Sequence, residues 1–554
     1  MNLSPLIKSI AVLVIAFASG IATALADPWS FGVIADSQWS APDDHKNPNS
    51  VAADIIKQID REFIAKRVRF VVAVGDTVDK PSPRSLATRA LYAQDLYNAG
   101  IALYPLRGNH EAKWKESGPE FARVFPQIGT GLNNNTPADI TPANTISALD
   151  LATNPPAAKS GSPFRLGTNF SAPATNETYH SVSYSFDYED TRFVLIDQFG
   201  GPGATTITEQ QEWLSSRLAD PKRPLQAFVF GHEGIIGHPH KDTLFTADTG
   251  GGSGSETAAQ EAAQNRFYAS LAQNRVHLYI SGHDHHYNES VLTSPDGKNS
   301  VRQIISASDG SHCYDPEPLP EKAKTVAIDR DVIGYYIYTV DGPRITMDFY
   351  GVNIKSMEDK NNMISTTPEL TGHWQKLERS GYSLNGKEMI IPQGAPYSIL
   401  SDKHDGTEMH ILSGTNSSTA ANCGTPLVKA INTGWAKGAG WGLLKGREFD
   451  ILSLWGMAEL GSGGKTDTYV ISMSFDPAYL FFSAAGPFLA TRDEGGHWVN
   501  AVDTNIGNDH KNSFWGRAWT PDRVLGDYGI DPDTKTAWAV VNHDGEFAVL
   551  CGKP

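Results

Sequence analysis

The stretch Phe31–Asp36 (Phe-Gly-Val-Ile-Ala-Asp) is a short apolar run that ends in a carboxylate. Two further apolar runs, Val68–Val74 and Ile101–Leu106, likewise lead into polar loops. Between the three runs lie Val51–Lys66, with apolar residues at helical spacing, and Arg84–Asn98, which also reads as a helix. This strand–helix–strand–helix–strand order predicts an α/β layer fold with its functional loops at the strand ends.

The pattern is interrupted by a segment rich in Asn, Thr, Ala and Pro at about 126–180, which we interpret as an insertion over the surface. Beyond it, the sequence predicts a helix at Thr208–Leu218 and a flexible Gly/Ser loop at 249–255. Arg302–Ala307 and a hairpin of Tyr335–Val340 and Arg344–Tyr350 are expected to close the domain with a second sheet. Further strands are expected at 181–187, 191–199, 226–230 and 276–280.

The texture of the sequence changes after about residue 353. Helical periodicity becomes weak, short β-rich runs lie between Gly- and Asp-containing turns, and eight of the 12 tryptophans occur here. We therefore expect a first domain at 27–352 and a mostly β accessory domain at 353–554. Thr491–Trp498 is similar to the Asp-box hairpin of sialidase-type propellers, but the unit occurs once, which favours a single hairpin.

The charge balance limits the classes of function. The 554 residues include 46 Lys and Arg against 62 Asp and Glu, for a formal net charge of −16. A chain this acidic lacks the basic patch of a nucleic-acid binder. A small phosphorylated substrate stays compatible with the sequence if bound metal ions supply local positive charge.

The N-terminus has the features of a secretory signal peptide at 1–26. Lys8 precedes an uncharged stretch, and Ala24-Leu25-Ala26 offers a cleavage site. The alternative is an uncleaved anchor, because the uncharged run approaches the length of a membrane span. We expect cleavage, no later membrane span, and export to the periplasm or the extracellular space.

Cysteine usage gives no disulfide framework. Cys313, Cys423 and Cys551 allow at most one intramolecular disulfide, and no CxxC or zinc-ribbon spacing is present.

Five short elements carry the candidate chemistry, four of them at the ends of predicted strands. They are Asp36–Gln38, Gly75–Asp79, Gly108–Glu111, Gly231–Glu233 and Gly282–His285. Because ligands of α/β sheets bind where strand ends converge, we expect these elements to meet at one place. Their mixture of carboxylate, amide and imidazole groups suits Mn, Fe or Zn and lacks the thiolates of a structural zinc site.

In this order the five elements resemble the blocks of the calcineurin-like metallophosphoesterase family, D-x-H, G-D-x-x-D/N, G-N-H-D/E, G-H and G-H-x-H. The resemblance covers roughly Trp29–Tyr350. It implies a four-layer α/β/β/α sandwich with two central mixed sheets, here followed by the mostly β domain. It also implies a metal-dependent phosphoric ester hydrolase.

The resemblance further implies a ligand set for two divalent or trivalent transition-metal ions. Its members are the bridging Asp76, then Asp36, Gln38 and His285 at the first site, and Asn109, His232 and His283 at the second. His110 would be catalytic, donating a proton to the leaving group or steadying the phosphoryl oxygens, and Asp79 would support the loop. Two metals about 4 Å apart hold a hydroxide for in-line attack and neutralise phosphoryl charge.

One position departs from the family pattern, because Gln38 stands where the first block has His. An amide oxygen is a harder and weaker ligand than imidazole, which favours Mn over Fe or Zn. The same D-x-Q occurs in manganese-dependent ADP-ribose/CDP-alcohol diphosphatases, and their first strand is similar to Phe31–Asp36.

Three functions follow for comparison. The leading one is an exported dinuclear phosphoesterase that hydrolyses phosphomonoesters or phosphodiesters. The narrower alternative is a nucleotide diphosphate, CDP-alcohol or ADP-ribose-type diphosphatase. The alternative from another class is a non-catalytic envelope or glycan-binding protein with a decayed metal site, against which the intact Asp76, Asn109 and His110 argue.

Overall fold

The computed structural model describes most of the chain outside the N-terminus and several loops. The described residues are 28–38, 49–125, 128, 167–173, 182–199, 207–237, 239–240, 242–245, 257–310, 314, 323–355, 370, 372–384, 387–391, 396–399, 407–413, 429–438, 449–455, 467–475, 486–507 and 511–551. The predicted signal peptide, most of the predicted insertion, the Gly/Ser loop, Cys313 and Cys423 lie outside them.

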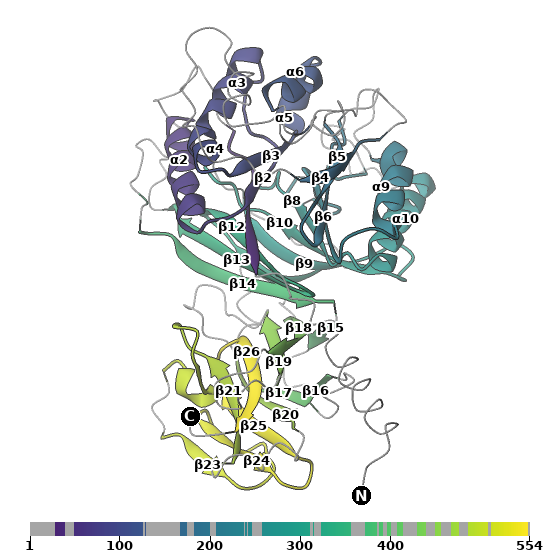
Figure 1. Cartoon of the computed structure of the whole chain (residues 1–554). Helices are drawn as coiled ribbons and strands as arrows, with labels where there is room; N and C mark the ends of the chain where they lie inside the picture. Colours follow the sequence, from purple (N-terminus) through teal and green to yellow (C-terminus); the bar gives the residue numbers. More distant parts are fainter. Residues whose placement is uncertain are drawn as a thin grey trace, which may run out of the picture.

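The N-terminal part alternates strands and helices, as its sequence predicts (Figure 1). Its helices are α2 (Asn49–Ala65), α3 (Pro83–Tyr92), α4 (Gln94–Asn98), α5 (Asn109–Ala112), α6 (Ser117–Val124), the 3₁₀ turn η4 (Thr208–Gln210), α9 (Gln211–Ala219) and α10 (Ala258–Gln273). Its strands are β1 (Trp29–Ile34), β2 (Phe70–Val74), β3 (Ala102–Leu106), β4 (Thr168–Ser171), β5 (Tyr184–Tyr188), β6 (Thr191–Ile196), β7 (Gln226–Gly231), β8 (Leu278–Ser281), β9 (Tyr287–Thr293), β10 (Ser300–Ile305), β11 (Ala323–Asp329), β12 (Val332–Asp341), β13 (Arg344–Asn353) and β14 (Gln375–Ser383).

These strands form two mixed sheets, which confirms the predicted fold class. The first has the order β14-β13-β12-β1-β2-β3, in which β1, β2 and β3 are parallel and β12 joins β1 antiparallel. The second has the order β11-β9-β10-β8-β7-β6-β5-β4, with β6, β7, β8 and β10 parallel. The carboxyl ends of parallel strands therefore lie together within each sheet.

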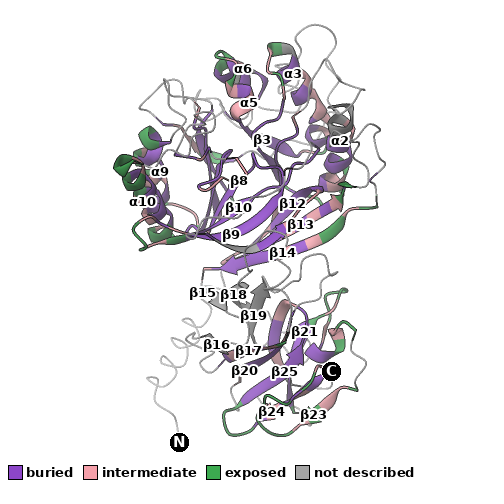
Figure 2. Cartoon of the chain, turned by 180° about the vertical axis from the view of Figure 1, so that it is seen from behind, coloured by how far each residue is buried: buried purple, intermediate pink, exposed green. Residues whose placement is uncertain are grey.

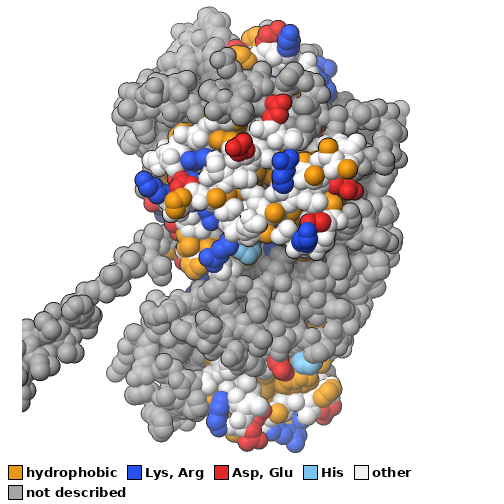
Figure 3. Space-filling model, turned by 90° about the vertical axis from the view of Figure 1, so that its right-hand side faces the viewer, with side chains coloured by type: hydrophobic (Ala, Val, Ile, Leu, Met, Phe, Trp, Pro, Cys, Tyr) orange, Lys and Arg blue, Asp and Glu red, His pale blue; other side chains and the backbone are white. Residues whose placement is uncertain are grey.

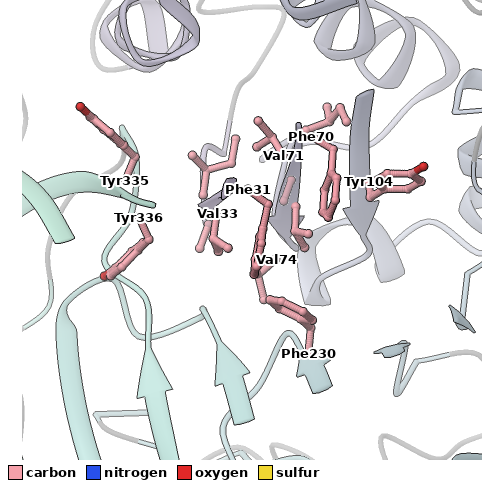
Figure 4. Close-up of a cluster of buried hydrophobic side chains, with 14 of the residues drawn as sticks. Phe31, Val33, Phe70, Val71, Val74, Tyr104, Phe230, Tyr335 and Tyr336 are labelled. Atoms are coloured by element: carbon pink, nitrogen blue, oxygen red, sulfur yellow. The ribbon is translucent and has the colours of Figure 1, made fainter. Parts of the chain in front are cut away.

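Aromatic side chains pack the two sheets face to face. The Phe31 ring of the first sheet lies edge-on to Phe193 and Phe228 of the second, at centroid distances of 5.0 and 5.2 Å. Figure 4 shows Phe31 and its neighbours in this cluster, with Phe230 reaching up from the second sheet. Alternation of bulky apolar residues on these strands thus produces an interior buried from both sides.

Helices cover the outer faces and complete four layers. On α2 the residues Ile55, Ile59 and Phe63, at spacings of four, are buried in the same core as the first sheet. On the other side, Phe267 and Leu271 of α10 pack in a second core with β6 and β7. Figure 2 shows buried residues over the sheets and exposed residues on the outer sides of the helices.

Several predictions need correction. The helix expected at 84–98 is two helices that meet at Ala93. The hairpin β12–β13 joins the first sheet, whereas β10 belongs to the second. β14 pairs with β13 beyond the expected boundary at residue 352, so the first sheet continues to Ser383. Arg379 of β14 forms a bidentate pair with Asp348 of β13 at 2.6 and 2.9 Å, so side chains as well as backbone join the two strands.

The C-terminal part consists mostly of strands, as expected. They are β15 (Lys387–Ile391), β16 (Pro396–Ile399), β17 (Thr407–Ser413), β18 (Lys429–Gly438), β19 (Phe449–Trp455), β20 (Thr468–Ser474), β21 (Pro487–Arg492), β22 (Trp498–Asn500), β23 (Ser513–Trp515), β24 (Asp527–Asp531), β25 (Thr536–Val541) and β26 (Gly545–Cys551), with the 3₁₀ turn η8 (Ala501–Thr504). They form two six-stranded sheets, β15-β18-β19-β26-β21-β22 and β16-β17-β20-β25-β24-β23. The hairpin predicted at Thr491–Trp498 is confirmed as β21 paired with β22.

The described surface carries charges of both signs. On the face drawn in Figure 3, Lys and Arg side chains are interspersed with Asp and Glu among the described residues. No helix in the described ranges is both long enough and apolar enough to cross a membrane.

Candidate active site

The five sequence elements converge at the carboxyl ends of five parallel strands. Asp36 follows β1, Asp76 follows β2 and Asn109 follows β3 in the first sheet, while His232 and His283 follow β7 and β8 in the second. Gly282 N–H donates to the His232 carbonyl at 2.9 Å, and Asp36 N–H donates to the Gly75 carbonyl at 3.2 Å, so the loops are joined through their backbones. The predicted convergence of the strand ends is therefore present.

The backbone at this place is strained. Left-handed backbone occurs at five of the predicted site residues, with φ of 54° at Asp36, 46° at Gln38, 48° at Asp76, 75° at His283 and 54° at His285. Non-glycine residues in this region are uncommon, and such strain persists where surrounding structure fixes it, often at functional sites.

Two glycines leave room for the carboxylates. A Cβ atom on Gly108 would lie 2.0 Å from Asp76 Oδ1, and one on Gly282 would lie 2.5 Å from Asp36 Oδ2. Both contacts are far below van der Waals distance. The glycines of the third and fifth elements are therefore required for close approach.

Asp36 connects the first and fifth elements. Its carboxylate accepts the His283 backbone N–H at 3.0 and 2.9 Å and lies 3.7 Å from His285 Nε2. Burial raises the pKa of Asp36, and His232 opposes that rise. A carboxylate this deeply buried is stabilised by positive charge placed beside it.

Asp76 lies at the centre of the cluster. Its Oδ1 accepts the His110 backbone N–H at 2.9 Å, and its Oδ2 lies 3.4 Å from both His232 Nε2 and Gln38 Nε2. Burial by itself would raise the pKa of Asp76, but the neighbouring histidines, His232 first, hold it below its usual range. Asp76 thus faces both halves of the predicted ligand set.

His232 is held in one orientation. Its Nδ1 lies 2.9 Å from the Val74 carbonyl, which fixes the proton on that nitrogen. Its Nε2 lies 3.1 Å from Asn109 Oδ1 and faces Asp76. An imidazole lone pair, an amide oxygen and a carboxylate therefore meet at one point, which is a donor set suited to a divalent transition metal.

His283 completes this group from the second sheet. One candidate ligand atom from each of Asp76, His232 and His283 lies within 4.8 Å of the others, and all three residues are buried. This spacing fits ligands arranged around a single ion at bond lengths of about 2 Å. The residues present therefore fit the metal site that the sequence predicts.

Gln38 and His285 lie on the other side of Asp76. The Gln38 amide nitrogen is 3.3 Å from His285 Nε2 and 3.5 Å from His110 Nε2. Turning the amide by 180° presents Oε1, the atom able to bind a cation, to the same neighbours. Gln38 therefore lies beside His285 and His110, and its role as a metal ligand stays a prediction.

His110 is paired with Asp79. His110 Nδ1 lies 2.9 Å from the Asp79 carbonyl and 3.1 Å from its Oδ1, while Nε2 lies 3.8 Å from Asp76 Oδ2. Burial lowers the pKa of His110, but the hydrogen bond to Asp79 and the charge of Asp76 raise it to about 9. Asp79 therefore supports the His110 ring itself, a more specific contact than the loop support expected from sequence.

Several contacts that support the site were not predicted from the sequence, because the two residues of each contact are distant in the chain. The Arg107 guanidinium makes a bidentate pair with Asp197 at 2.6 and 3.0 Å, behind the Gly108–Glu111 loop. Ser37 donates to the buried Asp309 at 3.0 Å, and Asp242 accepts a bond from His283. The signal available in the sequence was weak, since each is an isolated polar residue beside an apolar run.

Comparisons with known proteins agree with this geometry. Residues 30–287 match the family described as calcineurin-like phosphoesterase. No curated protein sequence matches the chain.

Among solved structures, the chain is similar to the purple acid phosphatase PPD1 from yellow lupin (Lupinus luteus) seeds, with 14% identity over 58% of this chain and 51% of that chain and a TM-score of 0.33. It is similar to a dimetal phosphatase from Danio rerio, with 16% identity over 58% and 96% and a TM-score of 0.32. It is also similar to PhoD, with 12% identity over 64% and 70% and a TM-score of 0.35. The chain spans about half the length of the lupin protein, and at these TM-scores the likenesses say nothing of its substrate.

The assignment thus depends on the family match and on the cluster at the strand ends. The match covers all five elements and ends at the start of β9, before the remaining strands of both sheets. Residues 30–287 therefore match the calcineurin-like phosphoesterase family, and the cluster at the strand ends fits the metal site of a phosphoester hydrolase.

Proposed function

We propose that the protein is an exported dinuclear metallophosphoesterase that hydrolyses a small phosphomonoester or phosphodiester. The observation that carries the proposal is the buried convergence of Asp76, His232 and His283 within 4.8 Å of one another. The N-terminal Lys8 and Ala24–Ala26 pattern supports export.

The proposed ligands divide around Asp76. Asp36, Gln38 and His285 form the first site, and Gln38 Nε2 lies 3.4 Å from Asp76 Oδ2. Asn109, His232 and His283 form the second, where His232 Nε2 lies 3.4 Å from the same oxygen. That oxygen faces both groups, which supports Asp76 as the bridging ligand.

The donor types support the choice of metal. The proposed ligands are carboxylates, amides and imidazoles, with no thiolate. The Gln38 amide oxygen is a harder ligand atom than an imidazole nitrogen. We therefore propose Mn at the first site, with Fe and Zn as alternatives. When bound, two such ions activate water as the nucleophile and neutralise charge on the phosphoryl oxygens.

His110 is proposed as the proton donor. Its Nδ1–H is bound to Asp79, so Nε2, which faces Asp76, carries a proton only when the ring is the imidazolium cation. The hydrogen bond from Nδ1 to Asp79 favours the protonated ring and raises the pKa of His110. A protonated imidazole in this position supplies the leaving oxygen with a proton.

A narrower substrate class is the second candidate. Gln38 in the first element is the feature shared with ADP-ribose/CDP-alcohol diphosphatases, so a diphosphate diester is included among the substrates to test.

Metal analysis and a substrate panel test the proposal. We expect about two transition-metal ions per chain, lost on chelation together with activity and restored by Mn²⁺. Phosphomonoesters, phosphodiesters and diphosphate diesters are then assayed with Mn²⁺, Zn²⁺, Fe²⁺ and Mg²⁺. A protein that binds no Mn²⁺ and hydrolyses none of these compounds contradicts the proposed function.

The His110→Ala variant tests the proton-donor role. We expect turnover to fall by about 10²–10⁴-fold for an alkyl ester, whose alkoxide needs a proton, and by less for a nitrophenyl ester. Metal content should remain near the wild-type value, whereas His283→Ala should lower both. An equal loss for both leaving groups, or loss of metal from His110→Ala, contradicts the assignment.

A further inference from the structure

The imidazoles of the cluster differ in which nitrogen the protein occupies. In His232 and His110 the Nδ1 atom lies against a backbone carbonyl, at 2.9 Å from Val74 O and 2.9 Å from Asp79 O respectively. In His283 it is Nε2 that is occupied, at 3.0 Å from Asp242 Oδ1. The acceptor there is a carboxylate from a different loop.

The loop that carries Asp242 is anchored to the second sheet. Leu244 N–H donates to the Gly234 carbonyl at 2.8 Å, and Ile235 N–H donates to Gln303 Oε1 of β10 at 2.7 Å. Asp242 itself is 7% exposed. Its carboxylate is therefore presented to His283 by fixed backbone and is largely shielded from water.

Two contacts then define the His283 position. Its backbone N–H is bound to Asp36, and its Nε2 is bound to Asp242. Because a carboxylate oxygen at 3.0 Å requires an N–H opposite it, the proton lies on Nε2 and the lone pair on Nδ1. A carboxylate partner also increases the basicity of an imidazole ligand.

We propose that Asp242 is a positioning residue that fixes the His283 tautomer, so that Nδ1 is the atom offered to the second metal ion. This inference depends on the proposed dinuclear site. Partners of this kind typically change metal affinity by about 10–100-fold when removed.

A competing arrangement places an additional ion among Glu233, Asp242 and His283, whose candidate ligand atoms also lie within 4.8 Å of one another. Two contacts argue against it. An ion there would take the His283 nitrogen that Asp242 occupies, and the Glu233 carboxylate accepts a hydrogen bond from Gln198.

The test measures Mn²⁺ stoichiometry and release to a chelator for the full mature chain and three variants. In Asp242→Ala we expect one of two ions to be released at about 10–100-fold lower chelator concentration, with the other unchanged. Asp242→Asn should lie between this variant and the wild type, because the amide oxygen still accepts a bond from Nε2. Glu233→Gln is the matched control and should release Mn²⁺ as the wild type does.

Histidine ¹⁵N NMR of the metal-free protein gives a readout independent of metal. The His283 signal should report an Nε2–H tautomer in the wild type and in Asp242→Asn, and a tautomer mixture in Asp242→Ala. If Asp242→Ala does not fold, the Asp242→Asn release curve and spectrum carry the test.

The outcomes separate the two proposals. A wild type that binds no Mn²⁺ refutes the proposed function. A wild type with two ions and an Asp242→Ala variant with unchanged release refutes only the role of Asp242. A third ion in the wild type that is lost equally in Glu233→Gln and Asp242→Asn also refutes the positioning role of Asp242, and supports an additional metal site at Glu233, Asp242 and His283.

Discussion

Glu111 offers a quantitative test of how the catalytic loops are held. Its side chain is fully buried, and Oε1 accepts hydrogen bonds from Thr77 Oγ1 and Val78 N at 2.9 Å each. Oε2 accepts the Gly108 backbone N–H at 2.8 Å. One carboxylate thus joins the loop that carries Asp76 to the loop that carries Asn109 and His110.

The contacts give the expected magnitude. In Glu111→Gln the amide oxygen keeps the bonds to Thr77 and Val78, but the NH₂ group faces the Gly108 N–H, so one charged hydrogen bond worth about 2 kcal/mol is lost. In Glu111→Ala all three bonds are lost, which we expect to lower the free energy of unfolding by about 5 kcal/mol. Both variants should also bind Mn²⁺ more weakly, because the two loops are no longer held together.

Urea unfolding of the metal-free protein measures these differences, and hydrogen exchange at the Val78 and Gly108 amides shows where they arise. Glu111→Gln serves as the size-matched control for Glu111→Ala. If Glu111→Ala costs less than about 1 kcal/mol, or if the two variants are equally destabilised, the three bonds do not hold the loops as argued.

Three further predictions concern the metal preference of the first site, the pH dependence of stability and the end of the N-terminal domain. Gln38→His should bind the first metal ion more tightly and shift the metal preference toward Zn²⁺, since imidazole binds these ions more strongly than an amide; unchanged chelator release would show that Gln38 does not touch the metal. Burial first, then the charges of Arg302 and Arg275, lowers the pKa of His277 from 6.5 to about 4. Stability is therefore present above pH 6.5 and lost as pH falls toward 4, by up to about 3 kcal/mol, so His277→Gln should flatten the dependence of the unfolding free energy on pH in this window; an unchanged slope would contradict it. A chain that ends after Leu384 should keep hydrolysis of a nitrophenyl ester, whereas one that ends at Asn353 loses β14 and should aggregate; a folded but inactive 384-residue chain would place catalytic residues beyond it.

The sequence allowed the strands β1, β2 and β3 and the five site elements to be located because both depend on local patterns. Apolar runs followed by Asp, Asn or His mark a strand and its functional end, and these are continuous in the chain. The helix α10 was missed because its Ala- and Gln-rich sequence contrasts little between faces, although Phe267 and Leu271 are spaced by four. Its capping box, Thr257 with Gln260, was the usable signal.

The supporting contacts of the site were beyond prediction for a different reason. Arg107 and Asp197 are 90 residues apart, and Asp242 and His283 are 41 apart. Neither pair forms a local pattern. Arg107 and Asp197 meet because the two sheets face one another, and Asp242 and His283 meet because they follow the neighbouring strands β7 and β8. The pairing of β14 with β13 was missed for a similar reason. The two strands are separated by residues 354–374, and nothing in this part of the sequence indicates that they pair.

The left-handed backbone at the site has a consequence for anyone who seeks a more heat-resistant form of this protein. Glycine adopts such conformations without steric penalty, while Asp and especially His do so at about 1 kcal/mol or more each. A selection for thermal stability alone would therefore favour glycine at His283 and His285, whose φ values are 75° and 54°. Since His283 and His285 are proposed metal ligands, these descendants would lose the proposed hydrolysis, so such a selection must include turnover as a second criterion.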